Sequence, residues 1–211
     1  MPDESAPAVT GIVLAGGRSS HMGRDKASLA LDGRTLLQRT VDALAQVAQE
    51  IVVVRAPVRA LPSLQCALPL HEVEDAVEGE GPLLGIAAGL RAASAPVALI
   101  VGCDMPFLRP ALLRLLAARA AAGARFVLPS YDGRPQPLCS ALRRDALAVV
   151  DAHIAAGDRA ILAIAQDIDA ALVLPEQWAV ADPDGRSFQN VNTPEEFEAA
   201  RARLAGSGDR R

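Results

Sequence analysis

The sequence lacks several features that would assign it to a common class at once. Its three cysteines, Cys66, Cys103 and Cys139, include no CxxC pair, which excludes a zinc site of paired cysteines and indicates a reducing compartment. It also has no excess of basic residues. The net charge is -4 and the pI is about 5.4, which argues against a basic nucleic-acid-binding face. We therefore expect free thiols and no nucleic-acid partner.

Long apolar runs and a cationic leader are also missing. The N-terminus, MPDESAPA, carries acids and prolines, and the apolar run at 12–15 is too short for a signal sequence or a membrane span. The sequence therefore predicts a cytoplasmic protein with no membrane partner. It contains no repeat and no linker rich in Gly or Ser, and 211 residues suit one domain. We expect that domain at 9–204, with disordered tails at 1–8 and 205–211.

Apolar, β-branched runs alternate with helical patterns along the first two thirds of the chain. Strands are expected at 9–14, 51–54, 97–104 and 125–128, and helices at 35–48, 83–93 and 110–122. This alternation predicts an α/β fold with a mostly parallel sheet, helices on both faces and ligands at the carboxyl ends of the strands. The last third is less regular: we expect a strand running back at 137–142, a helix at 145–155, a strand at 172–174 and a final capped helix at 194–204.

The stretch LAGGRSSHMGRDK, residues 14–26, follows the first strand. It is not a Walker motif, because Arg24 and not Lys follows Gly23, and it lacks the spaced glycines of the dinucleotide fingerprint. However, Gly16 and Gly17 would let backbone N–H groups approach an anion, and Lys26 could neutralise its charge. From these residues alone, a phosphate-binding loop and a simple chain reversal remain equally open.

Two other segments carry polar side chains suited to a nucleotide site. Asp104 ends an apolar strand, where a carboxylate can hold Mg²⁺ together with substrate phosphates, although a turn or helix-cap aspartate is the commoner occurrence. Asn190 and Asn192 occupy alternate positions and hence one side of an extended segment, where they could contact phosphate, metal or a heterocycle, or could cap the following helix.

A glycine-rich segment, EDAVEGEGPLLGI, precedes the expected helix at 83–93. Gly81 and Gly85 could let a flat base pack against the backbone, or could serve a loop and a close helix contact. Asp75 could bond a ribose or a base, or could be a solvated acid. The segment itself does not decide between these roles for the glycines or for Asp75.

Taken in order, these blocks resemble the molybdenum cofactor guanylyltransferases, the MobA type of nucleotidyltransferase. LAGGRSSHMGRDK is similar to the family's LAGGxSxRMGxxK and GPLLGI to its GPLAGI, and CDMPF, GRPQPL and NVNTPEE follow in the same order, so that the resemblance runs from about residue 9 to 203. It implies a three-layer α/β/α fold with a Rossmann-like, mostly parallel sheet. The implied reaction transfers GMP from GTP to the terminal phosphate of molybdopterin and releases pyrophosphate.

The resemblance also implies a role for individual residues. Nucleotide contacts would come from Leu14, Ala15, Gly16, Gly17 and Asp75, while Lys26 and Asp104 would be catalytic, Lys26 on the phosphates and Asp104 as the ligand of Mg²⁺. Gln136, Asn190 and Asn192 would face the acceptor. The implied partners are GTP, molybdopterin and molybdoenzyme insertion factors.

Two departures leave alternatives open. His21 stands where the family has arginine, and histidine is only partly charged near neutral pH; Arg55 stands where some members carry asparagine. We expect His21→Arg to raise the affinity for nucleotide phosphates. A nucleotidyltransferase with another nucleotide or acceptor, such as a cytidylyltransferase, and a cofactor-handling partner that binds nucleotide without turnover are the competing hypotheses.

Overall fold

A computed structural model describes residues 7–16, 26–57, 60–75 and 80–208. Over this part of the chain an eight-stranded sheet has the order β10-β7-β9-β6-β1-β4-β5, with β8 paired to β7. The strands are β1 (Val9–Leu14), β4 (Glu50–Arg55), β5 (Leu70–Glu74), β6 (Val97–Gly102), β7 (Phe126–Tyr131), β8 (Arg134–Pro135), β9 (Cys139–Arg143) and β10 (Ala171–Val173). β6, β1, β4 and β5 are parallel, so their carboxyl ends lie along one edge.

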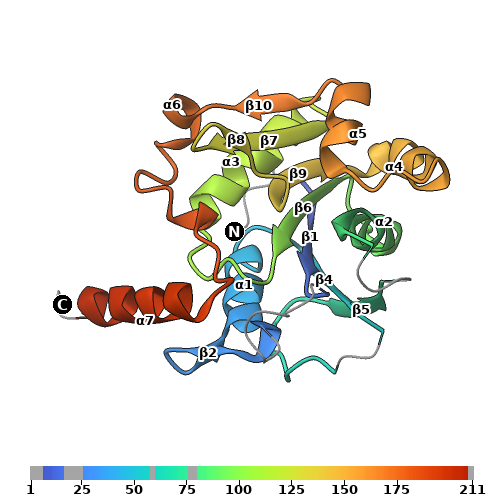
Figure 1. The fold of residues 1–211 in the computed structure, drawn as a ribbon. Coiled ribbons are helices and arrows are strands. Elements are labelled where there is room, and N and C mark those ends of the chain that lie inside the picture. Colours follow the sequence, from blue (N-terminus) through green and yellow to red (C-terminus); the bar gives the residue numbers. More distant parts are fainter. Residues whose placement is uncertain (1–6, 17–25, 58–59, 76–79, 209–211) are drawn as a thin grey trace.

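Helices cover both faces of the sheet, as Figure 1 shows, and this confirms the predicted three-layer α/β/α fold. On one face lie α1 (Leu36–Leu44) and α3 (Pro110–Ala121), and on the other α2 (Pro82–Ala92), α4 (Leu147–Ala155) and α5 (Ile161–Asp167). Strand alternation explains the two cores: in β1, Val9 and Val13 pack towards α1 and α3, while Ile12 packs towards α2.

The expected return strand is present as β9, which runs antiparallel to both β6 and β7. Among the strands of the main sheet and the helices that cover it, β5, β8 and α5 were not predicted. β5 is a half-exposed edge strand with charged residues, so it lacks the apolar run that marks the central strands. α5 spans seven residues, too few to show a helical period clearly.

The remaining elements connect or follow the strands and helices described above. They are the one-turn helix η1 (Lys26–Ser28), the hairpin of β2 (Ala30–Leu31) and β3 (Arg34–Thr35), η2 (Arg144–Ala146), α6 (Pro175–Trp178), η3 (Arg186–Phe188) and α7 (Pro194–Gly208). α7 projects from the body in Figure 1, and Ala200 on its inner side packs with Leu31, Leu36 and Val191. The helix continues past Leu204, where we expected it to end. None of the helices in the described segments is both long enough and apolar enough to cross a bilayer.

Candidate functional site

The ends of the two central strands bring together segments that are distant in sequence. Leu14 at the end of β1 pairs with Gly102 at the end of β6, and the Cys103 N–H donates to the Leu14 carbonyl at 3.2 Å. The Ala15 N–H donates to the Val54 carbonyl at 2.8 Å. Leu14, Ala15 and Asp104 therefore lie at the same edge, as the parallel arrangement predicts.

Lys26, Asp104 and Asn192 form a closed ring of contacts at this edge. Lys26 Nζ donates to Asn192 Oδ1 at 2.7 Å and lies 3.9 Å from Asp104 Oδ2. The main chain closes the ring, because the Val191 N–H donates to the Asp104 carbonyl at 2.9 Å. The structure thus brings together three of the predicted site residues from three separate parts of the chain.

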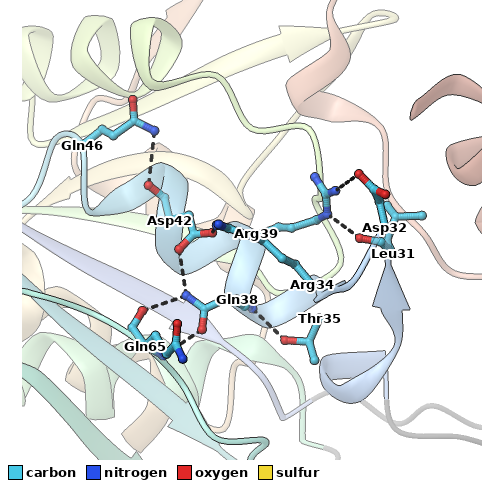
Figure 2. Close-up of polar contacts among 9 residues, drawn as sticks. All are labelled: Leu31, Asp32, Arg34, Thr35, Gln38, Arg39, Asp42, Gln46 and Gln65. Atoms are coloured by element: carbon cyan, nitrogen blue, oxygen red, sulfur yellow. Dashed lines mark hydrogen bonds and ion pairs between the residues drawn. The ribbon is translucent and has the colours of Figure 1, made fainter. Parts of the chain in front are cut away.

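A polar network around α1 fixes the segment that carries Lys26. Ala27 in η1 is buried, and the Leu36 N–H donates to the Leu29 carbonyl at 2.9 Å. Figure 2 shows how α1 holds the hairpin: Arg39 Nε donates to the Leu31 carbonyl at 3.0 Å, and Thr35 Oγ1 accepts the Gln38 N–H at 3.0 Å as the cap of the helix. Lys26 therefore stands on a supported turn.

The start of α7 fixes Asn192 in a similar way. Thr193 Oγ1 accepts the Glu196 N–H at 3.2 Å, and Glu196 Oε2 accepts the Thr193 N–H at 3.1 Å, which is the predicted capping box. The same oxygen also accepts the Asn192 N–H at 2.6 Å. One carboxylate therefore caps the helix and holds the asparagine that binds Lys26.

Burial dominates the electrostatics of Asp104. The side chain is 21% exposed, and burial raises the pKa of its carboxyl group, while the nearby Lys26 ammonium opposes that rise only in part. Within the described segments, no three His, Cys, Asp or Glu side chains are grouped so that they could hold a metal ion. Asp104 is a carboxylate beside an ammonium and an amide, and the nearby Glu196 carboxylate adds to the rise in its pKa.

Asp75 lies against the first turn of α2. Its N–H donates to the Arg55 carbonyl at 2.8 Å, and a methyl group added at Gly85 would lie 3.4 Å from both Asp75 Oδ2 and Leu14 Cδ2. Gly81 precedes α2 with a φ of 90°, a conformation that favours glycine. The structure therefore joins the GPLLG block to the end of β1, although they are far apart in sequence.

The other predicted residues differ in how they are placed. Gln136 precedes β9, its N–H donating to the Pro129 carbonyl at 2.8 Å and its Nε2 to the Arg134 carbonyl at 3.1 Å. Asn190 is exposed and lines a groove beside α7. Gly16 is half-buried after β1, whereas Gly17 and His21 lie outside the described residues.

Sequence analysis missed the groove beside α7. Its cavity volume is about 350 Å³, and it is lined by Phe107, Tyr131, Phe188, Gln189, Asn190, Val191, Glu196, Ala199, Ala200 and Arg203. Three separate segments supply the aromatic rings, so no local pattern could have indicated it. The capping box could have placed the Glu196 carboxylate at the start of α7, but it could not have predicted the bond to Asn192.

The fold of this chain is the one found in solved nucleotidyltransferases. Solved structures with the same fold include the molybdopterin-guanine dinucleotide biosynthesis protein A of Archaeoglobus fulgidus, at a TM-score of 0.77 and 23% identity, covering 93% of this chain and 99% of that chain. Another is the 2-C-methyl-D-erythritol 4-phosphate cytidylyltransferase of Thermus thermophilus, at a TM-score of 0.70 and 23% identity, covering 94% of this chain and 99% of that one.

Comparison of sequences assigns the chain to a particular family. Residues 11–171 match the MobA-like NTP transferase domain, and the chain belongs to that family. A relative in Chloroflexus aggregans, described as a probable molybdenum cofactor guanylyltransferase, is 37% identical over 93% of this chain and 95% of its own length. The molybdenum cofactor guanylyltransferase of Desulfosudis oleivorans is 33% identical over 93% of this chain and 96% of its own length. The predicted family is confirmed.

Proposed function

We propose that this protein transfers GMP from GTP to the terminal phosphate of molybdopterin and releases pyrophosphate. The ring formed by Lys26, Asp104 and Asn192 at the carboxyl edge of the sheet is the observation that carries the proposal. It lies beside the end of β1, where backbone N–H groups after a buried strand can approach phosphates closely. Relatives that share about a third of its residues over nearly the whole chain are named for this activity.

In the proposed reaction an oxygen of the acceptor's terminal phosphate attacks the α-phosphorus of GTP. A new P–O bond forms, the bond from the α-phosphorus to the bridging oxygen of the β-phosphate breaks, and that oxygen leaves with pyrophosphate. The attacking phosphate is already ionised at neutral pH, so the reaction needs no general base from the protein. It needs alignment of two anions and neutralisation of their charge.

Lys26 supplies the positive charge in this proposal. Asn192 holds its ammonium group at 2.7 Å, so that the charge is oriented before the nucleotide arrives. The backbone of Leu14, Ala15, Gly16 and Gly17 would contact the nucleotide, and Asp75 would do so beside Gly85.

The residues at this edge fit Mg²⁺ delivered with the triphosphate. Asp104 is a hard oxygen donor, and Mg²⁺ is commonly bound by one or two carboxylates together with substrate phosphates and waters. We propose Asp104 as its protein ligand. The bound ion would neutralise phosphate charge and polarise the α-phosphorus.

We propose that Asn192, Asn190 and Gln136 contact the acceptor. Asn192 belongs to the ring of contacts with Lys26 and Asp104, and Asn190 and Gln136 lie near the same carboxyl edge of the sheet. The guanine dinucleotide would then pass to molybdoenzyme insertion factors. We propose the cytoplasm as the site of the reaction, in keeping with the scattered cysteines.

The assay that tests the function measures pyrophosphate release from GTP with Mg²⁺ and molybdopterin. We expect release that depends on all three components and that falls at least about 100-fold in Asp104→Ala, since loss of a charge-stabilising group costs that much in comparable sites. A folded wild-type protein that binds GTP but releases no pyrophosphate would instead be a cofactor-handling partner without catalysis.

A cytidylyltransferase is the second candidate, because the Thermus thermophilus enzyme shares the fold. The GPLLG block at the start of α2, which places Gly85 beside Asp75, favours guanine in our proposal because the family's GPLAGI is similar to it. Calorimetric titration with GTP, CTP and ATP distinguishes the candidates. We expect GTP to bind most tightly, whereas preference for CTP would overturn the assignment of the nucleotide.

A further inference from the structure

The groove beside α7 collects most of the few aromatic rings in the protein. The sequence has one tryptophan, one tyrosine and four phenylalanines. Phe107, Tyr131 and Phe188 line the groove, and Trp178 packs behind them, its ring centroid 5.0 Å from that of Phe188 and 6.1 Å from that of Tyr131. Tyr131 and Phe188 lie 4.9 Å apart. These contacts join Tyr131, Phe188 and Trp178 in one aromatic cluster, and Phe107 completes the aromatic wall of the groove.

The groove also has polar side chains in its lining, and one of them links it to the functional site. Asn190, in the extended segment before α7, lines the groove, and so do Glu196 and Arg203 from α7. Glu196 also accepts the Asn192 N–H, and Asn192 accepts from Lys26. The groove therefore lies next to the segment that carries Asn192, and two hydrogen bonds connect Glu196 in its lining to Lys26.

The size and lining of the groove select a class of ligand. A volume of about 350 Å³ is near the lower end of the range for small-molecule sites, about 300–1,000 Å³, so the groove suits one ring system and not a whole dinucleotide. An aromatic wall binds flat heterocycles by stacking. The Asn190 amide, which both donates and accepts, and the Arg203 guanidinium, which donates, suit the edge of a ring rich in nitrogen and carbonyl groups.

We propose that this groove binds the pterin ring of the acceptor and thereby directs the acceptor's phosphate to Lys26 and Asp104. The inference rests on the proposed function, because it names the place of one of the two substrates. Stacking on the aromatic wall would fix the ring, and Asn190 would fix its orientation. The nucleotide would occupy the other side of the edge, beside Leu14 and Gly85.

Two substitutions on α7 test the groove. Ala199 is exposed and lines it, so Ala199→Leu would fill it with little strain on the fold. Ala202 is exposed on the same helix but lines a different hollow, together with Glu198, Arg201 and Ala205, so Ala202→Leu is the matched control. In steady-state assays we expect Ala199→Leu to raise the KM for molybdopterin about ten-fold or more, with the KM for GTP unchanged, because the added side chain occupies the ring's place. Ala202→Leu should change neither.

Trp178 gives a second readout that needs no turnover. It is the only tryptophan, and a pterin absorbs light in the range where tryptophan emits. Titration of the full-length protein with 6-hydroxymethylpterin in the absence of nucleotide should therefore quench its fluorescence. We expect saturable quenching in the wild type and in Ala202→Leu, and a weaker titration in Ala199→Leu.

The outcomes separate this proposal from the function on which it rests. If the wild type makes the dinucleotide but Ala199→Leu and Ala202→Leu have equal KM values for molybdopterin, the groove does not bind the ring and the inference is wrong. If the wild type makes no dinucleotide, the proposed function fails, while saturable quenching that Ala199→Leu weakens would still support a pterin site in the groove. Quenching that is equal in all three proteins would overturn it.

Discussion

Asp104 combines a functional position with a cost in stability. Its carboxyl group is mostly buried, and because burial raises its pKa, the folded protein holds that proton more tightly than the unfolded chain does. Ionisation of Asp104 at neutral pH therefore destabilises the free protein. The site keeps a charge there because the proposed reaction needs an oxygen ligand at the edge of the sheet.

This cost leads to a prediction for Asp104→Asn. We expect thermal unfolding of the ligand-free variant at a higher temperature than wild type, with about 2–4 °C gained for each kcal/mol relieved, and loss of dinucleotide synthesis. Lys26 keeps its bond to Asn192 in the variant, so the fold around it should persist. An unchanged or lower melting temperature would show that the ion pair with Lys26 outweighs burial.

At the scale of elements, the start of α7 controls the placement of Asn192. Glu196 accepts two backbone N–H groups there, and loss of a helix cap costs about 0.5–2 kcal/mol. We expect Glu196→Ala to lower the melting temperature by a few degrees and to free Lys26 for faster reaction with an amine-directed acylating reagent. Lys26 is the only lysine in the sequence, so acylation of one peptide reports it.

Two variants give this test its controls. Glu196→Gln keeps a carbonyl acceptor and should restore much of the wild-type protection of Lys26. Glu198→Ala makes the same change of charge in the same helix, but Glu198 pairs with Arg201 at 3.0 Å, and acylation of Lys26 should stay at the wild-type rate. Equal acylation in all four proteins would mean that Glu196 does not position Asn192.

His153 joins α4 to α5 in a way that depends on pH. Its Nδ1 lies 3.0 Å from Asp158 Oδ2 and its Nε2 lies 2.9 Å from Asp167 Oδ2. The hydrogen bond with Asp158, together with Asp167, raises the pKa of His153. Asp158 also accepts the Ala160 N–H, so this pair fixes the turn between the two helices.

The direction of the shift sets the expected pH dependence. A histidine whose pKa rises on folding stabilises the protein fully below its unfolded pKa of about 6.5, and that stabilisation is lost as pH rises through the higher folded value. We expect the melting temperature of wild type to exceed that of His153→Gln at pH 6 and the difference to shrink at pH 9. His71→Gln, at an exposed position on β5, is the control. A difference that is constant with pH would contradict the account.

At the scale of the whole molecule, the sequence predicted the three layers of the fold but not the groove beside α7. Buried central strands such as β1 and β6 are continuous apolar runs, and α3 is a long helix that begins at a proline and buries several leucines, so these elements could be predicted. The order of motifs predicted that Lys26, Asp104 and Asn192 serve one site. The edge strand β5 and the short α5 carry weak patterns because each buries little apolar surface.

The groove could not have been predicted because it exists only in three dimensions. Phe107 follows β6, Tyr131 ends β7 and Phe188 lies in η3, and each of these rings alone is consistent with ordinary core packing. Only the return of the chain from η3 along Asp104 into α7 places them around one cavity. Tertiary contacts of this kind leave no local period in a sequence.

The most direct test of the central claim identifies the product. The protein is incubated with molybdopterin, Mg²⁺ and equal concentrations of GTP and CTP, and the dinucleotide formed is identified by mass spectrometry. The account predicts molybdopterin guanine dinucleotide, formed with one pyrophosphate for each molecule of product. Formation of the cytosine dinucleotide as the main product, or of no dinucleotide by a folded protein, would contradict it.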